Sequence, residues 1–110
     1  MQRILFLGDS RQRLQDFPDD ARQRAGHQLF EVQAGAEPVD WKPMKSVGAG
    51  VREIRVRVAA GAFRVLYVLV VEERVLVLHA FEKKTQATPQ RDIDLAAKRL
   101  KEWKGSNHGS

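Results

Sequence analysis

The chain has 110 residues, of which 43% are hydrophobic, and it contains no cysteine. This length suits one domain and leaves no room for a second core, and the lack of cysteine excludes disulfides and thiolate metal sites. The formal net charge is +5 and the pI is ≈ 10.0, so we expect an anionic partner, either nucleic acid or an acidic protein.

The N-terminus has an apolar run of only four residues, 4–7, before Gly8. That run is too short for the apolar part of a signal peptide. No run in the sequence approaches the ~18 apolar residues of a membrane-spanning helix. We therefore expect a soluble protein in the cytoplasm, and the lack of cysteine fits a reducing compartment, although many exported proteins share it.

The N-terminal part predicts one strand and two antiparallel helices. Residues 3–7 are typical of a short strand, and Asp9 or Ser10 can cap the helix that follows. Pro18 then starts a second helix, because proline suits the first helical turn, and Gly35 is a natural end for it. The apolar stripe of this second helix has spacings of four, four and three residues and consists of Ala21, Ala25, Leu29 and Val32.

The part of the chain after residue 50 predicts three consecutive antiparallel strands. The first alternates between apolar and charged residues, which is typical of a half-buried strand. The second is almost entirely apolar and should be the central strand. The strands are expected at 53–58, 63–71 and 74–81, with turns at 59–62 and at Glu72-Glu73, after an irregular segment from 36 to 50.

A last helix should begin at Thr88 and Pro89, with Thr88 as its cap. Together these elements predict an α+β fold: a small, twisted, mainly antiparallel sheet with an N-terminal helical hairpin and a C-terminal helix. The domain should span residues 1–104, followed by a disordered tail at 105–110. The apolar stripe of the last helix consists of Ile93, Ala96, Ala97, Leu100 and Trp103.

The charge imbalance is concentrated in the segment 41–85. This segment has nine cations and four anions, and 9 − 4 = +5 equals the net charge of the whole chain. A small sheet with one apolar face and one basic face is suited to binding polyanions, with nucleic acid as the leading candidate. The nine cations are Lys42, Lys45, Arg52, Arg55, Arg57, Arg64, Arg74, Lys83 and Lys84.

Arg64 interrupts the apolar run of the central strand. If residues 60–61 form the tip of the hairpin, Arg64 lies opposite Arg57, and opposed like charges on a sheet are unfavourable. A phosphate between the two arginines would relieve this repulsion, and so would a shift in register or screening by Glu53. A buried arginine must reach either a solvent-filled cleft or a carboxylate, and Glu53 and Glu82 are the candidate carboxylates.

Lys83 and Lys84 follow the third strand, where they could hold phosphates or, with a lowered pKa, transfer protons. The alternative interpretation is an ordinary solvated loop. His79 should lie opposite Leu66 and share a face with Arg64, although a lone strand histidine is more often a core residue than a catalyst. The three histidines of the chain have no metal-ligand spacing, so we predict no metal and no cofactor.

The order of elements and several motifs resemble the RelE/HigB/ParE toxin superfamily, and in particular its phage-derived HigB-like branch. The resemblance spans roughly residues 3–103. Its most specific part is an Arg-Val-Leu-Tyr strand followed by Phe-x-Lys-Lys-Thr-x-x-Thr-Pro. The segments that carry it are 29–35, 41–48, 51–56, 63–67 and 81–89.

The resemblance implies the toxin of a type II toxin–antitoxin system. Most relatives of this kind are metal-independent endoribonucleases that cut mRNA in the ribosomal A site, with the RNA 2′-hydroxyl as the nucleophile. The implied partners are mRNA, the ribosome and a cognate antitoxin of the helix-turn-helix type. ParE-type toxins use the same scaffold to inhibit DNA gyrase, so the alternatives are a non-enzymatic toxin of that type or an inactive relative that only binds RNA or its antitoxin.

The resemblance also implies roles for single residues. Arg64 matches a phosphate-stabilising arginine, Arg55 matches a basic strand position used by some relatives, and Lys83 and Lys84 match the basic end of the last strand. Four further basic residues and the strand histidine are expected to bind RNA: Lys42, Lys45, Arg52, Arg57 and His79.

Two positions depart from the family pattern. Glu53 occupies the place of a lysine that some relatives use as a base, which implies either a carboxylate base or weaker catalysis. Several active relatives have Tyr or His near the end of the chain, where this chain has Trp103 and, in its tail, His108.

Overall fold

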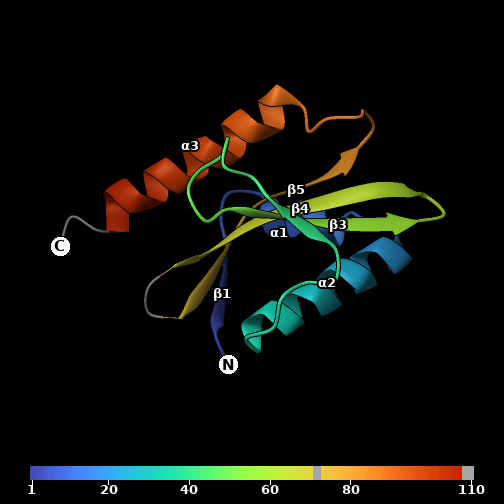
Figure 1. The fold of residues 1–110 in the computed structure, drawn as a ribbon, viewed down its shortest axis with the longest axis horizontal. Helices are drawn as coiled ribbons and strands as arrows, with labels where there is room; N and C mark the ends of the chain where they lie inside the picture. The colour runs from blue at the N-terminus through green and yellow to red at the C-terminus, as the bar shows by residue number, and fades with distance from the viewer. Residues whose placement is uncertain (71–72, 108–110) are drawn as a thin grey trace.

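The computed structural model describes residues 1–70 and 73–107. The described residues form three helices and five strands (Figure 1). In chain order they are β1 (Arg3–Phe6), α1 (Ser10–Gln15), α2 (Asp19–Gln33), β2 (Trp41–Pro43), β3 (Arg52–Val58), β4 (Gly61–Val70), β5 (Arg74–Lys83) and α3 (Gln90–Asn107).

The five strands form one mixed sheet in the order β1-β5-β4-β3-β2. All neighbouring strands are antiparallel except β1 and β5, which run parallel. A parallel pair needs a long connection, and here the connection contains all of the elements between β1 and β5. The predicted α+β fold with a mainly antiparallel sheet is confirmed.

The sheet has a separate apolar core on each face. In Figure 1, α3 lies on one side of the strands and α2 on the other. The alternation of β3 explains this division, because Ile54 and Val56 face α2 while Glu53 and Arg55 face the other way. β4 and β5 are apolar on both faces and contribute to both cores. The α3 side is completed by Met44, Val47 and Val51 from the loop after β2, and by Ala96, Leu100 and Trp103 from α3.

The ends of the first two helices match the predictions only in part. Gly35 follows α2 with φ +94, as expected of a glycine that ends a helix. Asp9 precedes α1 without making a side-chain cap; its carboxylate pairs with Arg99 of α3 instead. Ser10 is buried and donates its hydroxyl hydrogen to the carbonyl of Val77 in β5 at 3.2 Å. These side chains therefore fasten α1 to the rest of the fold.

The register of the β3–β4 hairpin differs from the predicted one. The two-residue tip is formed by residues 59–60, and Gly61 begins β4 with φ +144. A positive φ of this kind favours glycine, so the glycine lies just after the tip and not within it. As a result Arg55, not Arg57, lies opposite Arg64.

Two local features were not predicted. The segment 36–50, expected to be irregular, contains the short strand β2, which pairs with the first residues of β3. A β-bulge interrupts the β4–β5 ladder between Leu66 and Tyr67. The pairing of His79 with Leu66 is nevertheless as predicted.

Several predictions concern the ends and turns of the chain. The predicted tail began at residue 105, but α3 continues to Asn107, and residues 108–110, including His108, lie outside the described residues. The predicted turn at Glu72-Glu73 is described only for Glu73, which has φ +55. None of the described helices combines the length and apolar character needed to cross a bilayer.

Candidate functional site

A buried ion pair lies on the sheet face that α3 covers. Glu53 of β3 and Arg64 of β4 have side chains that are 0% and 5% exposed, and Arg64 Nε lies 3.5 Å from Glu53 Oε1. Lys42 Nζ lies 3.7 Å from the same oxygen, and Thr88 donates its hydroxyl hydrogen to Glu53 Oε2 at 2.6 Å. The carboxylate is therefore enclosed by cations and a hydroxyl of the protein itself.

Arg64 also lines an open pocket of about 600 Å³ at the β3–β4 turn. The sequence left open whether Arg64 reaches a carboxylate or a solvent-filled cleft. The structure shows both, since Arg64 pairs with Glu53 and also lines this pocket. Burial lowers the pKa of Arg64, and the negative charge of Glu53 opposes that change. The other residues that line the pocket are Arg57, Ala62, Lys83, Lys84, Thr85 and Gln86.

The two lysines of this pocket differ in their environment. Lys83 is the last residue of β5. Partial burial lowers the pKa of the Lys83 ammonium, and the positive charge of Arg64 lowers it further. Lys84 is exposed, and its Nζ lies 4.0 Å from Glu82 Oε1. Lys83 is therefore better suited to proton transfer, and Lys84 to holding an anion as a point charge.

The two arginines of β3 are also held differently from one another. Arg55 lies opposite Arg64, but its guanidinium binds Asp40, with Nε at 2.9 Å and Nη2 at 2.7 Å from the same carboxylate oxygen. The repulsion expected between two opposed arginines is thus relieved by two protein carboxylates, one for each arginine. Arg57 lies two residue pairs nearer the turn and lines the pocket with Arg64.

The remaining predicted cations are spread over different parts of the molecule. Lys42 joins the buried ion pair, whereas Lys45 is exposed in the loop after β2. In the β3–β4 register Arg52 lies directly opposite Tyr67, and residues opposite each other share a face of the sheet. The Tyr67 side chain belongs to the core on the α2 side, so Arg52 lies on the face opposite Arg64. Its guanidinium carbon lies 4.1 Å from the centre of the Trp41 ring.

His79 is fully buried against α3. Its Nε2 lies 2.7 Å from Asp92 Oδ1, and its ring stacks on Phe81, with 5.0 Å between the ring centres. Burial lowers the pKa of His79, and the hydrogen bond with Asp92 opposes that change. A side chain with 0% exposure cannot reach RNA at the surface, so this position predicted for RNA binding serves the packing of α3 on the sheet.

Three partners of the site were missed by sequence reasoning: Asp40, Thr88 and Asp92. Thr88 is predicted as the cap of a helix that begins at Pro89, but α3 begins at Gln90 and the Thr88 hydroxyl donates to Glu53, 35 positions away. The only available signal was the alternation of β3, which indicated that Glu53 shares a face with the strand arginines. Such a buried carboxylate needs a donor, but the sequence does not identify it.

Among residues 1–70 and 73–107, no group of three or more His, Asp or Glu side chains is arranged so that it could hold a metal ion. The pocket beside Arg64 instead has four cations among its lining residues and no anion. Its chemistry suits the binding of phosphate groups.

The fold and the pocket define a small α+β domain with a cationic pocket at the end of its sheet. A scan of protein families matches residues 12–101 to the family described as phage-derived protein Gp49-like (DUF891). Because the match covers most of the chain, the protein belongs to this family, a phage-derived toxin-like family within the toxin–antitoxin group. A search of the curated proteins finds no match.

Proposed function

We propose that this chain is the toxin of a type II toxin–antitoxin pair, a relative of HigB and RelE, and that it cleaves mRNA on the ribosome without a metal. The observation that carries the proposal is Arg64, a nearly buried arginine in the wall of a pocket whose charged lining residues are all cations. Such a pocket can hold and stabilise a phosphate that gains negative charge during reaction. Membership of a toxin-like family supports the same conclusion.

In the proposed reaction the RNA 2′-oxygen attacks the adjacent phosphorus, and its proton passes to Lys83. The bond from phosphorus to the 5′-oxygen breaks, leaving a 2′,3′-cyclic phosphate, and the 5′-oxygen takes a proton from a lysine ammonium. Lys83 suits the role of base because its lowered pKa increases the fraction of neutral amine. Arg64 stabilises the pentavalent phosphate, while Arg57 and Lys84 hold neighbouring phosphates.

Glu53 is proposed as a positioning residue and not as the base. A base must reach the proton that it removes, and the Glu53 carboxylate is fully buried. Its oxygens face Arg64, Lys42 and Thr88. Glu53 therefore fixes the orientation of Arg64 and lowers the charge that this arginine presents to RNA.

RNA contacts outside the pocket are proposed for Lys42 and Lys45, and Arg55 can contribute if it exchanges Asp40 for a phosphate. Arg52 is not included, because it lies on the opposite face of the sheet. The expected partners are ribosome-bound mRNA in the cytoplasm and a cognate antitoxin, which the family supports; its helix-turn-helix type is an expectation from the resemblance.

The test is induction of the protein in cells, followed by mapping of mRNA 5′ ends. We expect growth arrest with new 5′ ends inside coding regions. The Lys83→Arg variant keeps the positive charge but cannot act as a base at neutral pH, so it should lose most cleavage, whereas Lys84→Arg should retain most of it. Equal activity of both variants would remove Lys83 from the mechanism.

A second candidate function is inhibition of DNA gyrase without RNA cleavage. It is favoured by the composition of the pocket, since the described residues that line it include no Tyr or His, and by Glu53, which already neutralises part of the charge of Arg64. Growth arrest with intact mRNA and altered DNA supercoiling would establish this function instead. An absence of growth arrest would indicate an inactive relative that only binds RNA or its antitoxin.

A further inference from the structure

The outer edge of β3 is only partly covered by β2. The β2–β3 pairing extends from Arg52 to Ile54. In the part of the chain that the structure describes, no strand pairs with residues 55–58 on the side away from β4. An uncovered strand edge offers backbone donors and acceptors to another extended chain.

The hydrogen bonds of this edge show which backbone groups face outward. The N–H of Arg55 donates to the carbonyl of Asp40 at 2.8 Å, and Arg24 Nη1 of α2 donates to the carbonyl of Arg57 at 3.2 Å. By the alternation of an antiparallel ladder, the carbonyl of Arg55 and the N–H of Arg57 point to the same side. Among the described residues neither group has a partner on that side, so one acceptor and one donor flank Val56.

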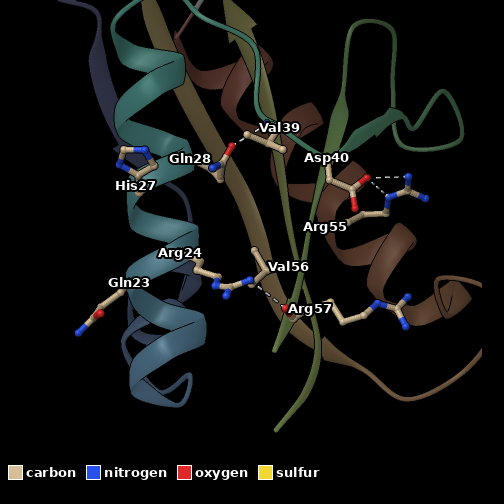
Figure 2. A pocket seen from close by; sticks show the side chains of 9 residues that line it. All are labelled: Gln23, Arg24, His27, Gln28, Val39, Asp40, Arg55, Val56 and Arg57. Carbon is tan, nitrogen blue, oxygen red and sulfur yellow. Dashed lines mark hydrogen bonds and ion pairs between the residues drawn. The ribbon is translucent and has the colours of Figure 1, made fainter. Parts of the chain in front are cut away.

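A groove of about 520 Å³ lies between this edge and α2. Figure 2 shows Arg24 reaching from α2 to the backbone of β3, with Val39 and Val56 among the side chains around the groove. Val39 is 88% exposed, so the groove has apolar surface beside the open edge. Its charges are three arginines, Arg24, Arg55 and Arg57, against one aspartate, Asp40.

We propose that this groove binds an acidic, extended peptide segment, which adds to the sheet as a further strand along residues 55–58 of β3. Main-chain hydrogen bonds to the outward groups give the affinity, and carboxylates of the segment pair with Arg24 and its neighbouring arginines. The assignment of this segment to the antitoxin rests on the proposed function, whereas the docking of an acidic strand does not.

Two other occupants fit the groove less well. RNA could use the arginines, but its phosphates offer no donor for the Arg55 carbonyl and would be repelled by Asp40. A second copy of the chain would bring its own arginines opposite these ones and would add a further charge of +5. An acidic peptide is the partner that satisfies the open backbone groups and the charge together.

The proposal is tested by NMR titration with a synthetic peptide of about seven residues that alternates Glu and Val. We expect the amide signal of Arg57 to shift and its hydrogen exchange to slow, while the amide of Glu53, at the edge already covered by β2, is unaffected. The same peptide with Lys in place of Glu should bind at least about tenfold more weakly. Every second residue of the bound peptide should direct its N–H toward β3. N-methylation of that set should abolish binding, and N-methylation of the other set should not.

Charge-matched variants locate the binding to the groove. Arg24→Glu should weaken binding of the acidic peptide by about tenfold or more, whereas Arg11→Glu, an equal change of charge at an exposed site on α1, should change it less than about twofold. Equal losses in both variants would overturn the proposal, because the attraction would then be unspecific. It would also be overturned if the peptide failed to bind, if methylation had no effect, if a short RNA slowed the hydrogen exchange of the Arg57 amide as much as the peptide does, or if the protein dimerised through this edge.

The peptide-binding test can be evaluated whether or not the protein is toxic. If induction of the wild-type protein leaves growth and mRNA unchanged but the peptide adds to β3, the toxin function fails and the docking edge remains. If the wild type cleaves mRNA and the peptide leaves the Arg57 amide unchanged, the docking edge fails and the toxin function remains.

Discussion

Glu53 and Arg64 illustrate how a buried ion pair can limit what a single substitution reveals. Both side chains are withdrawn from water, and the two charged groups lie 3.5 Å apart. Removal of one member leaves the other charge buried, which commonly destabilises a protein by about 3–5 kcal/mol. A loss of toxicity in Arg64→Ala could therefore reflect unfolding as easily as lost chemistry.

We predict that Arg64→Ala lowers the free energy of unfolding by about 3 kcal/mol, at the lower end of that range, because Lys42 still lies near the carboxylate. The double variant Glu53→Gln with Arg64→Met should stay within about 1 kcal/mol of the wild type, since the one charge that loses its partner, Lys42, is 39% exposed and stays hydrated. Urea unfolding of the purified variants measures both values. A double variant as unstable as the single one would show that the pair itself is needed for folding.

That double variant is also the sharper test of activity. If it folds like the wild type but no longer cleaves mRNA, the ion pair of Glu53 and Arg64 acts in the chemistry. If it folds and remains fully toxic, the pair is purely structural and the catalytic role of Arg64 is wrong.

His79 predicts a pH dependence of stability. Its pKa in the folded protein is lowered by burial, so the unfolded chain binds the proton more readily between the folded value and about 6.5, the usual value for histidine. The unfolded state is then favoured as the pH falls, and stability should decrease on acidification below about pH 6.5. Asp92, Arg99 and Arg13 are the charged groups that act on His79.

The measurement is thermal unfolding of the wild type and of His79→Gln across this pH range. The amide of glutamine keeps a donor for Asp92 but does not titrate, so the slope of Tm against pH below about 6.5 should become shallower. His27→Gln, at an exposed position on α2, controls for the loss of a histidine as such. An unchanged slope in His79→Gln would place the acid sensitivity elsewhere.

At the scale of elements, α3 depends on a small number of apolar anchors. Trp103 is 6% exposed and packs in the same core as Leu100 and Leu76. We predict that Trp103→Ala lowers the free energy of unfolding by about 3–5 kcal/mol. Phe30→Ala is the matched aromatic control, because Phe30 is 51% exposed on α2, and it should cost less than about 1 kcal/mol. Comparable losses would mean that α3 is only loosely docked.

The sequence predicted the longer elements because each has either a regular apolar period or a continuous apolar run. α2, β4, β5 and α3 all show such patterns, and their order was sufficient for the fold class. β2 was missed because three residues, one of them Pro43, carry no readable period. The hairpin register was wrong because it depends on which residue adopts a positive φ, and the alternatives differ by one position.

The candidate site was predicted less completely than the fold. Arg64, Lys83 and Lys84 were recognised because charges stand out in or beside apolar strands, and they line one pocket together with Arg57. The partner of Arg55 could not be predicted, since Asp40 lies in a loop whose path is set by tertiary contacts. Likewise, nothing local distinguishes a buried histidine such as His79 from one at the surface.

At the scale of the whole molecule, the excess positive charge should govern how fast partners associate. Electrostatic attraction raises association rates more than it lowers dissociation rates, and salt screens it over a distance of roughly 10 Å at 0.1 M. We predict that the association rate with an acidic antitoxin falls steeply with salt while the dissociation rate changes little. Stopped-flow measurements from low to high salt provide the check, and an association rate that is constant with salt would contradict the prediction.

The parallel pairing of β1 with β5 has a consequence for how the chain is made. The first strand finds its partner only when residues 74–77 have been synthesised, and Arg99 must follow before Asp9 can be fastened to α3. Contacts between such distant parts of a chain slow folding. The pocket needs β3, β4 and β5 in place, so it forms late in translation. A chain whose synthesis ends before residue 90 therefore lacks α3.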